Sequence, residues 1–236
     1  MITLGLDTAT SACACALWSA DQGRVLAAQA EQMERGQAER LVPLVQAVLA
    51  EAGIGFGDID RIGVTVGPGT FTGLRIGLAA ARGFALAAGC PLVGVTTLEA
   101  AVAGLQPLPA EGIILAVIES RREDLFVQPF STQGEVLGEA VDILPVDFPA
   151  YAARFGNDGP LTLVGDAAIR GAKALEGVSA PLHVVETQGR AEALAVARIV
   201  AGLTAPAIAS RPADPFYLRP PDVSLPKDRL AKGAQA

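Results

Sequence analysis

A glycine-rich turn followed by a long, nearly uncharged helix is the feature that most constrains this chain. Residues 67–77 read GPGTFTGLRIG and follow the alternating apolar run of residues 62–66, so we expect a strand, a tight turn and a helix over 71–88. The only charged residues of that helix are Arg75 and Arg82, which share one narrow face. A helix that covers only its own sheet should show a broad polar face. We therefore expect this helix to be buried on two sides, by its own sheet and by another subunit.

The same turn has a second interpretation, because a glycine-rich turn before a helix can aim backbone N–H groups at a phosphate. No Gly-Lys-Ser/Thr follows it, and the glycine fingerprint of dinucleotide-binding folds is absent. In the structural interpretation, Gly67 and Gly69 form the turn, while Gly73 and Gly77 let another helix approach closely. We favour this one, because each mid-helix glycine weakens an isolated helix by about 1 kcal/mol and close packing would offset that loss.

Composition excludes several classes of protein. The 236 residues are 51% hydrophobic and 18% charged, which allows a large core and indicates that another chain covers part of the surface. A net charge of −7 argues against autonomous nucleic-acid binding. The three cysteines form no CxxC pair, and neither a signal peptide nor a membrane-spanning run is evident, so we expect a cytoplasmic protein that binds no membrane.

Strand and helix signals occur twice in the same order, βββαβαβα, without visible sequence identity between the halves. Two stacked lobes of this kind are the plan of the two-lobed actin-like ATPase (ASKHA) fold, an α/β fold. We expect a first lobe over residues 1–105, which includes the helix described above, and a second lobe over residues 106–210. A Pro-rich, mildly basic tail would follow over residues 211–236.

The tail allows two interpretations, a solvated and partly disordered end or a contact to RNA. It has an excess of two positive charges. The basic residues are Arg211, Arg219, Lys227, Arg229 and Lys232, and the acidic ones are Asp214, Asp222 and Asp228.

The turn after the first predicted strand, residues 7–11 (DTATS), stands where the first hairpin of actin-like ATPases meets the phosphates of ATP. An aspartate with following hydroxyls could hold a magnesium-bound phosphate, or it could simply cap a hairpin turn. The matching turn of the second half, residues 119–124, has no glycine, and the adenosine-side turn at 165–168 has only one. We therefore expect no independent ATPase, and we interpret as vestigial nucleotide-binding residues Asp7, Thr8, Thr10 and Ser11.

Metal and nucleophile chemistry have little support. The only histidine, His183, falls in a predicted apolar strand, so we expect no metal site and no catalytic residue in this chain. Arg121 and Arg122 lie in the turn of the second half, and the sequence assigns them no role.

Residues 67–79 and 89–99 together resemble the TsaB (YeaZ) family, whose pattern GPG-(S/T)-FTGLRIGLA is followed by G-(I/C)-PL-(V/I)-GV-(S/T)-(S/T)-LE. The ending PFYLRPPDV at 215–223 is similar to the family's ending, whereas the middle matches weakly. The resemblance implies the actin-like fold. It also implies a non-catalytic subunit that binds and supports the catalytic subunit TsaD, which transfers threonylcarbamoyl to the adenosine next to the anticodon of tRNAs reading ANN codons.

By the same resemblance, the helices over 37–50 and 71–88 form the partner interface. The resemblance further implies that the TsaE ATPase joins the complex and that the isolated chain homodimerises through the same surface. It implies that this chain contacts tRNA only indirectly, through the complex. No tightly bound cofactor is implied: ATP or ADP would lie only at a subunit interface, and the metal belongs to TsaD. Gln37-Ala38-Glu39 replaces the family's His-Ser-Glu run. The expected interface residues are Glu39, Arg40, Leu44, Gly73, Leu74, Gly77, Ala80, Ala81 and Phe84.

Two other functions stay open. A small-molecule kinase or carbamoyltransferase of the same fold is the alternative, although the glycine-free turn of the second half counts against it. A self-contained homodimeric scaffold would explain the apolar helix equally well.

Overall fold

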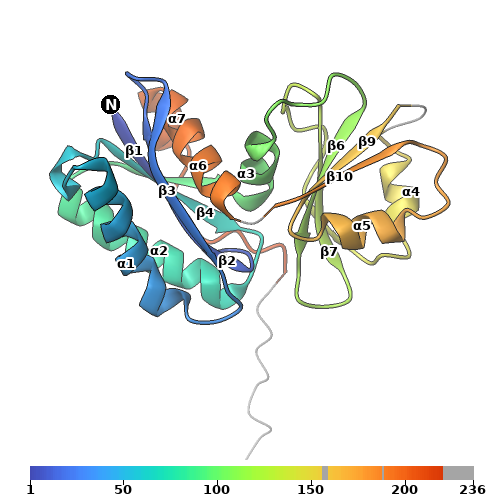
Figure 1. Ribbon diagram of the computed structural model, residues 1–236. Helices are drawn as coiled ribbons and strands as arrows, with labels where there is room; N and C mark the ends of the chain where they lie inside the picture. Colours follow the sequence, from blue (N-terminus) through green and yellow to red (C-terminus); the bar gives the residue numbers. More distant parts are fainter. Residues whose placement is uncertain (156–158, 188, 220–236) are drawn as a thin grey trace, which may run out of the picture.

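The computed structural model describes residues 1–155, 159–187 and 189–219. Two lobes lie side by side, and each is built on a five-stranded mixed sheet (Figure 1). The elements follow the predicted order βββαβαβα in both halves, with a short extra helix at the end. Within the described residues, every helix is too short or too polar to cross a bilayer.

The first sheet has the strand order β3-β2-β1-β4-β5. β1 pairs antiparallel with β2 and parallel with β4, so the hairpin strands join the parallel strands in one sheet. The strands are β1 (Ile2–Asp7), β2 (Ala12–Ser19), β3 (Arg24–Gln32), β4 (Arg61–Gly67) and β5 (Leu92–Thr96). Two helices cover one face of this sheet, α1 (Gln37–Ala52) and α2 (Phe71–Ala88), with the 3₁₀ turn η1 (Phe56–Asp58) between them.

The second sheet repeats this topology with the order β8-β7-β6-β9-β10. Its strands are β6 (Ile113–Glu119), β7 (Leu125–Phe130), β8 (Val141–Ile143), β9 (Leu161–Gly165) and β10 (Leu182–Glu186). The short helices α4 (Phe148–Ala152) and α5 (Ala168–Ala174) cover one of its faces with an apolar core. The recurrence of one topology on two unrelated stretches of sequence is the architecture that the element order predicts.

Two helices cross between the lobes. α3 (Thr97–Gly104) follows the first sheet but packs against the second, where Leu98 and Val102 join a core with the residues of β6. α6 (Arg190–Gly202) follows the second sheet but packs on β1, β2 and β4 of the first, and α7 (Ala205–Ala209) lies beside it (Figure 1). The predicted boundary at residue 105 therefore divides the sheets, whereas residues 190–210 belong by packing to the first lobe and not to the second.

α6 lies directly on the first sheet because a glycine stands at the contact. A Cβ at Gly5 would lie only 2.1 Å from the carbonyl oxygen of Ala193, so a larger residue would push the helix away. The guanidinium of Arg61 caps the other end of α6 by donating to its last carbonyl oxygens, which lack helical partners. Its Nη1 lies 2.9, 3.3 and 2.8 Å from the oxygens of Val200, Ala201 and Leu203.

Residues 211–219 form an extended strap along the first lobe. The backbone N–H of Gly94 donates to the Arg211 carbonyl at 3.1 Å, and that of Phe216 donates to the Val66 carbonyl at 2.7 Å. These bonds tie the strap to β5 and to the end of β4.

The strap then reaches the second lobe, where Arg219 forms ion pairs with Asp124 and with Asp142, the latter at 2.7 Å. The interpretation of the whole tail as a solvated, partly disordered end is therefore wrong for residues 211–219, because their backbone and side chains are bonded to both lobes. The remaining tail residues of the prediction, among them Lys227, Arg229 and Lys232, lie outside the described residues, as does the end of the PFYLRPPDV segment.

Candidate partner interface and vestigial nucleotide site

The glycine-bearing face of α2 is buried inside this chain. A Cβ at Gly73 would lie 2.0 Å from the Thr8 carbonyl oxygen, and one at Gly77 would lie 2.3 Å from the Thr8 hydroxyl oxygen. The prediction that these glycines admit another helix is wrong, because the space they leave is filled by the turn of residues 7–11. The small residues of α2 thus serve the contact between β1 and α2.

Several predicted interface residues cannot reach a partner, because the first lobe covers them. Leu44 is 3% exposed and packs in the core under α1. The residues of the predicted interface that this chain buries itself are Leu44, Gly73, Leu74, Gly77 and Ala81. For these five residues the interface prediction is wrong, since the apolar stripe that faces the sheet cannot also face a second subunit.

The other four predicted residues remain accessible. Glu39 and Arg40 are exposed on α1, where Arg40 pairs with Glu31 of β3. Ala80 and Phe84 are half-buried on α2, and the Phe84 ring stacks on Phe56 with centroids 5.4 Å apart. Their role at an interface stays a prediction.

An apolar surface does remain on the outer side of these helices. Leu86 is 86% exposed, Val42 42% and Phe71 41%, although all three are large apolar side chains. Ala79, Gly83 and Ala87 of α2 are exposed as well. We call the exposed residues of α1 and α2 the α1–α2 face, which lies on the outer side of the first lobe (Figure 1).

Both charged residues of α2 are engaged by neighbours within the chain. The Arg75 guanidinium lies 3.7 Å from the centroid of the Phe71 ring. Arg82 pairs with Asp214 of the strap at 3.1 Å and donates to the Ala213 carbonyl at 2.9 Å. Of the two charges, only that of Arg82 is offset by an acidic partner.

The turn of residues 7–11 is satisfied by its own chain. Asp7 is fully buried, and its Oδ1 accepts hydrogen bonds from the Ala9 N–H at 3.0 Å and from the Thr65 hydroxyl at 2.8 Å. The Thr10 hydroxyl donates to Asp7 Oδ2 at 3.4 Å. Burial raises the pKa of the Asp7 carboxyl above its ordinary value, although these hydrogen bonds lower it. The Asp7 carboxylate and the Thr10 hydroxyl, which the sequence suggested as phosphate ligands, are thus hydrogen-bonded to each other.

The turn of residues 7–11 and the turn of residues 67–73 fit into each other. The Thr8 hydroxyl donates to the Gly73 carbonyl at 2.8 Å, and the Thr70 N–H donates to the Ala9 carbonyl at 2.7 Å. A Cβ at Gly69 would lie 2.4 Å from that same Ala9 oxygen. Thr8 and Thr10 are buried, whereas Ser11 is half-buried, so of the four predicted nucleotide-binding residues only Ser11 keeps an accessible side chain.

Sequence reasoning missed two further carboxyls on which the charge of Asp7 acts, the half-buried Asp166 and the buried Glu192. Burial raises the pKa of Asp166, at the end of β9, to about 6, and that of Glu192, in the first turn of α6, to about 7. The negative charge of Asp7 adds to both shifts. Each accepts a backbone hydrogen bond at 2.9 Å, Asp166 from Glu119 and Glu192 from Gly189. Neither residue belongs to a sequence motif, because Gly189 has no side chain and so does not form with Glu192 the Ser/Thr-x-x-Glu pattern of a capping box.

These carboxyls give the region where the two lobes meet an acidic character that disfavours nucleotide phosphates. Among the residues described, no three His, Cys, Asp or Glu side chains are grouped in a way that could hold a metal ion to offset that charge. His183 is exposed on β10, at the edge of the second sheet.

The turn of residues 119–124 is held by charged side chains. Arg170 of α5 pairs with Glu119 at 2.6 Å and donates to the Arg122 carbonyl at 2.8 Å. Arg121 adopts a positive φ of 64°, and its guanidinium lies 3.7 Å from Glu34 in the first lobe. Arg121, for which the sequence suggested no role, thus connects the two lobes electrostatically.

Known proteins share this fold and sequence pattern. The family model described as "TsaD: tRNA N6-adenosine threonylcarbamoyltransferase" matches residues 22–176. The Escherichia coli protein named "tRNA threonylcarbamoyladenosine biosynthesis protein TsaB" is 38% identical over 126 residues, which is 53% of this chain and 53% of that protein. The chain belongs to this family, in its TsaB (YeaZ) branch. It spans about half the length of that E. coli TsaB protein.

Solved structures agree with the TsaB (YeaZ) assignment. YeaZ from Pseudomonas aeruginosa superimposes with a TM-score of 0.74 at 25% identity, covering 92% of this chain and 99% of that chain. The ROK hexokinase from Thermus thermophilus superimposes with a TM-score of 0.51 at 17% identity, covering 85% and 99% of the two chains. The second likeness concerns the fold alone, and it confirms the predicted actin-like plan of this TsaB-family chain.

Proposed function

We propose that this TsaB-family chain is a non-catalytic subunit that binds and supports a TsaD-type catalytic subunit during threonylcarbamoylation of tRNA. The modified base would be the adenosine next to the anticodon of tRNAs reading ANN codons. The observation that carries the proposal is the α1–α2 face, where Leu86 is 86% exposed on a helix with only two charged residues. Burying one such leucine against a partner contributes roughly 1.5–3 kcal/mol.

The non-catalytic part of the proposal rests on the region where the lobes meet around Asp7. Thr8, Thr10 and Asp7 are occupied by bonds within the chain, and Asp166 and Glu192 add buried carboxyls nearby. A kinase or carbamoyltransferase of this fold would need accessible donors for phosphate there. The engaged hydroxyls and the nearby carboxyls therefore disfavour the alternative enzyme function.

The proposal extends to the remaining partners. In it, the TsaE ATPase joins the complex in the cytoplasm, tRNA is met only through the assembled subunits, and ATP or ADP lies only at a subunit contact. The isolated chain homodimerises through the α1–α2 face, because a surface of apolar side chains exposed to water favours self-association when its partner is absent.

Co-expression with the TsaD subunit of the same organism, followed by size-exclusion chromatography, tests the proposal. Leu86→Glu and Ala79→Glu place a charge on the α1–α2 face, and we expect each to weaken the complex at least tenfold. Val146→Glu is the matched control, because Val146 is 79% exposed but lies in the second lobe. Substitutions at Gly77 or Ala81 would test folding instead, since both residues are buried.

Unchanged co-elution of both α2 variants with TsaD would show that the partner binds elsewhere. Loss of the homodimer in these variants, without any complex with TsaD in the unmodified chain, would favour the self-contained scaffold.

A further inference from the structure

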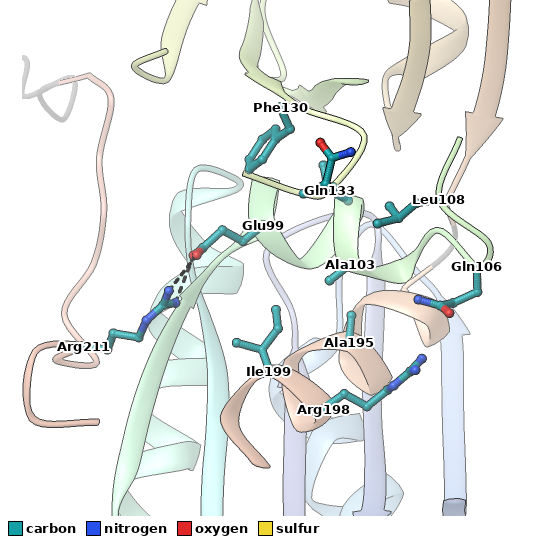
Figure 2. Close-up of a pocket in the computed structure, with 12 residues that line it drawn as sticks. Glu99, Ala103, Gln106, Leu108, Phe130, Gln133, Ala195, Arg198, Ile199 and Arg211 are labelled. Carbon is teal, nitrogen blue, oxygen red and sulfur yellow. Dashed lines mark hydrogen bonds and ion pairs between the residues drawn. The ribbon is translucent and has the colours of Figure 1, made fainter. Parts of the chain in front are cut away.

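A pocket of about 460 Å³ opens between the two crossing helices and the second lobe (Figure 2). One wall is formed by α3 and by the C-terminal half of α6, and the other by the linker residues 106–108 and the turn of residues 130–134. Its size is within the range of small-molecule sites. Both lobes contribute to it, so a bound molecule would contact both at once.

This pocket is distinct from the acidic space around Asp7. Glu192 lies in the first turn of α6, whereas the pocket is lined by residues from Ala195 to Ile199, further along the same helix. No residue of the turn 7–11 lines the pocket. An occupant here would therefore be independent of the vestigial nucleotide site.

The pocket is lined by apolar and polar groups in about equal measure, with a charged group at each end. Leu108, Phe130 and Ile199 supply apolar surface, and Figure 2 shows the Glu99–Arg211 pair at one end and Arg198 with Gln106 at the other. A site that offers both apolar surface and charged groups suits an amphipathic small molecule.

The two arginines differ in their partners. Arg211 donates to both carboxylate oxygens of Glu99, at 2.9 and 3.3 Å, so its charge is offset locally. Arg198 is half-buried, its guanidinium carbon lies 5.2 Å from the centroid of the Trp18 ring, and among the described residues it has no acidic partner. A half-buried guanidinium that only an aromatic ring contacts retains its capacity to bind an anion bidentately.

We propose that this pocket binds a small amphipathic anion, whose carboxylate or phosphate pairs with Arg198 and whose apolar part contacts Leu108, Phe130 and Ile199. The net charge of the pocket favours an anion, because the two arginines face a single glutamate. The ligand bridges α6 of the first lobe and the turn after β7 of the second.

Trp18 provides a built-in reporter for this proposal, because it is the only tryptophan of the chain and lies under Arg198. The full chain is titrated with hexanoate and with hexyl phosphate, and separately with hexanol as the neutral probe of equal chain length. Emission of Trp18 and isothermal calorimetry are followed in parallel. We expect saturable binding of at least one anion, at least tenfold tighter than hexanol. The anion that binds more tightly identifies the ligand as a carboxylate or a phosphate.

Three variants locate the binding. Arg198→Gln removes the charge and Ala103→Phe fills the pocket, so each should weaken anion binding at least tenfold. Arg198→Lys keeps the charge and should weaken binding less than Arg198→Gln. Arg154→Gln is the matched control, because Arg154 also lies over aromatic rings, 5.8 Å from Tyr151 and 5.7 Å from Phe155, but outside the pocket. Circular dichroism and unfolding midpoints confirm that each variant is folded.

Several outcomes would overturn the proposal. The first is that neither anion shows saturable binding. The second is that hexanol binds as tightly as the anions. The third is that Arg198→Gln and Arg154→Gln bind the anions with equal affinity. If Arg198→Gln does not fold, Ala103→Phe and Arg198→Lys decide the question, and binding that is unchanged in Ala103→Phe places the anion elsewhere.

Discussion

Thr8 and Gly73 are in close contact at two points, although 65 residues separate them in the chain. The Thr8 hydroxyl donates to the Gly73 carbonyl at 2.8 Å, and the Thr8 carbonyl oxygen lies 2.0 Å from the position that a Cβ on residue 73 would take. The turn after β1 and the first turn of α2 therefore form one packed unit. The sequence suggested a phosphate for the turn of residues 7–11 and a partner subunit for the glycine face of α2. In the structure these two segments pack against each other.

We expect Gly73→Ala to destabilise the protein by about 1–3 kcal/mol, because the new methyl group meets a backbone oxygen that cannot move alone. Urea unfolding of both proteins measures the difference. Gly83→Ala is the control on the same helix, because no atom lies within 4 Å of its added Cβ. There we expect a gain of about 0.5–1 kcal/mol from helix propensity. Equal effects at the two positions would contradict the packed unit.

Stability should fall as the pH rises from about 4.5 to 7, because folding raises the pKa of Glu192 from its ordinary value of 4.5 to about 7. Below pH 4.5 the Glu192 carboxyl is mostly protonated in both the folded and the unfolded protein, so it does not lower the free energy of unfolding. Above this window, the folded protein must hold a buried charge close to Asp7. We expect Glu192→Gln to be more stable than the unmodified chain at pH 8, by on the order of 1–3 kcal/mol, and to depend less on pH.

Urea unfolding at pH 5, 6.5 and 8 gives this pH dependence. Glu176→Gln, which removes an exposed carboxylate of the second lobe, controls for the change in net charge. Some dependence should remain in Glu192→Gln, because burial also raises the pKa of Asp7 and Asp166. A pH profile identical in all three proteins would show that Glu192 is not held as the structure shows it.

The strap should stabilise the first lobe. A chain that ends at Ser210 loses the bonds from Gly94 to Arg211 and from Phe216 to Val66, and the ion pair of Arg211 with Glu99. We expect it to be about 3 kcal/mol less stable than a chain that ends at Arg219, since each such bond contributes about 1 kcal/mol. Thermal and urea unfolding of the two truncated proteins test this, and equal stability would mean that the strap only lies on the surface.

The isolated chain should not hydrolyse ATP in the presence of magnesium. The side-chain hydroxyls of Thr8 and Thr10 are engaged within the chain, which leaves only that of the half-buried Ser11, and the neighbouring carboxyls Asp166 and Glu192 repel a phosphate. A coupled phosphate-release assay measures turnover, with a buffer blank as the baseline. Turnover above that baseline that disappears in Asp166→Asn would show that the space between the lobes is a working active site.

Local patterns in the sequence predicted much of the fold. The alternation in residues 62–66, the glycines of the following turn and the run after it place α2 at Phe71–Ala88, as the structure has it. The same kind of signal predicted the element order of both halves, because periodicity and turn residues act between neighbours in the chain.

The candidate site was predicted less well. Helical spacing showed that Gly73, Gly77 and Ala81 share a face of α2, but it did not show which neighbour that face meets. Asp166 and Glu192 gave no strong motif, since their pKa shifts come from burial by elements distant in sequence. The ordered strap was missed because its bonds run between backbone groups of residues far apart, such as Phe216 and Val66, which leave no periodicity behind.

The sequence by itself determined the secondary structure, the two-lobed repeat and the family, because these depend on patterns that a linear chain carries within short windows. Only the tertiary structure decided which side of α2 stays exposed, that Thr8 fills the space at Gly73, and that α6 returns to the first sheet. The physical reason is that burial and close packing arise between residues far apart in the chain. Which of two equally apolar helix faces is covered depends on what folds against it.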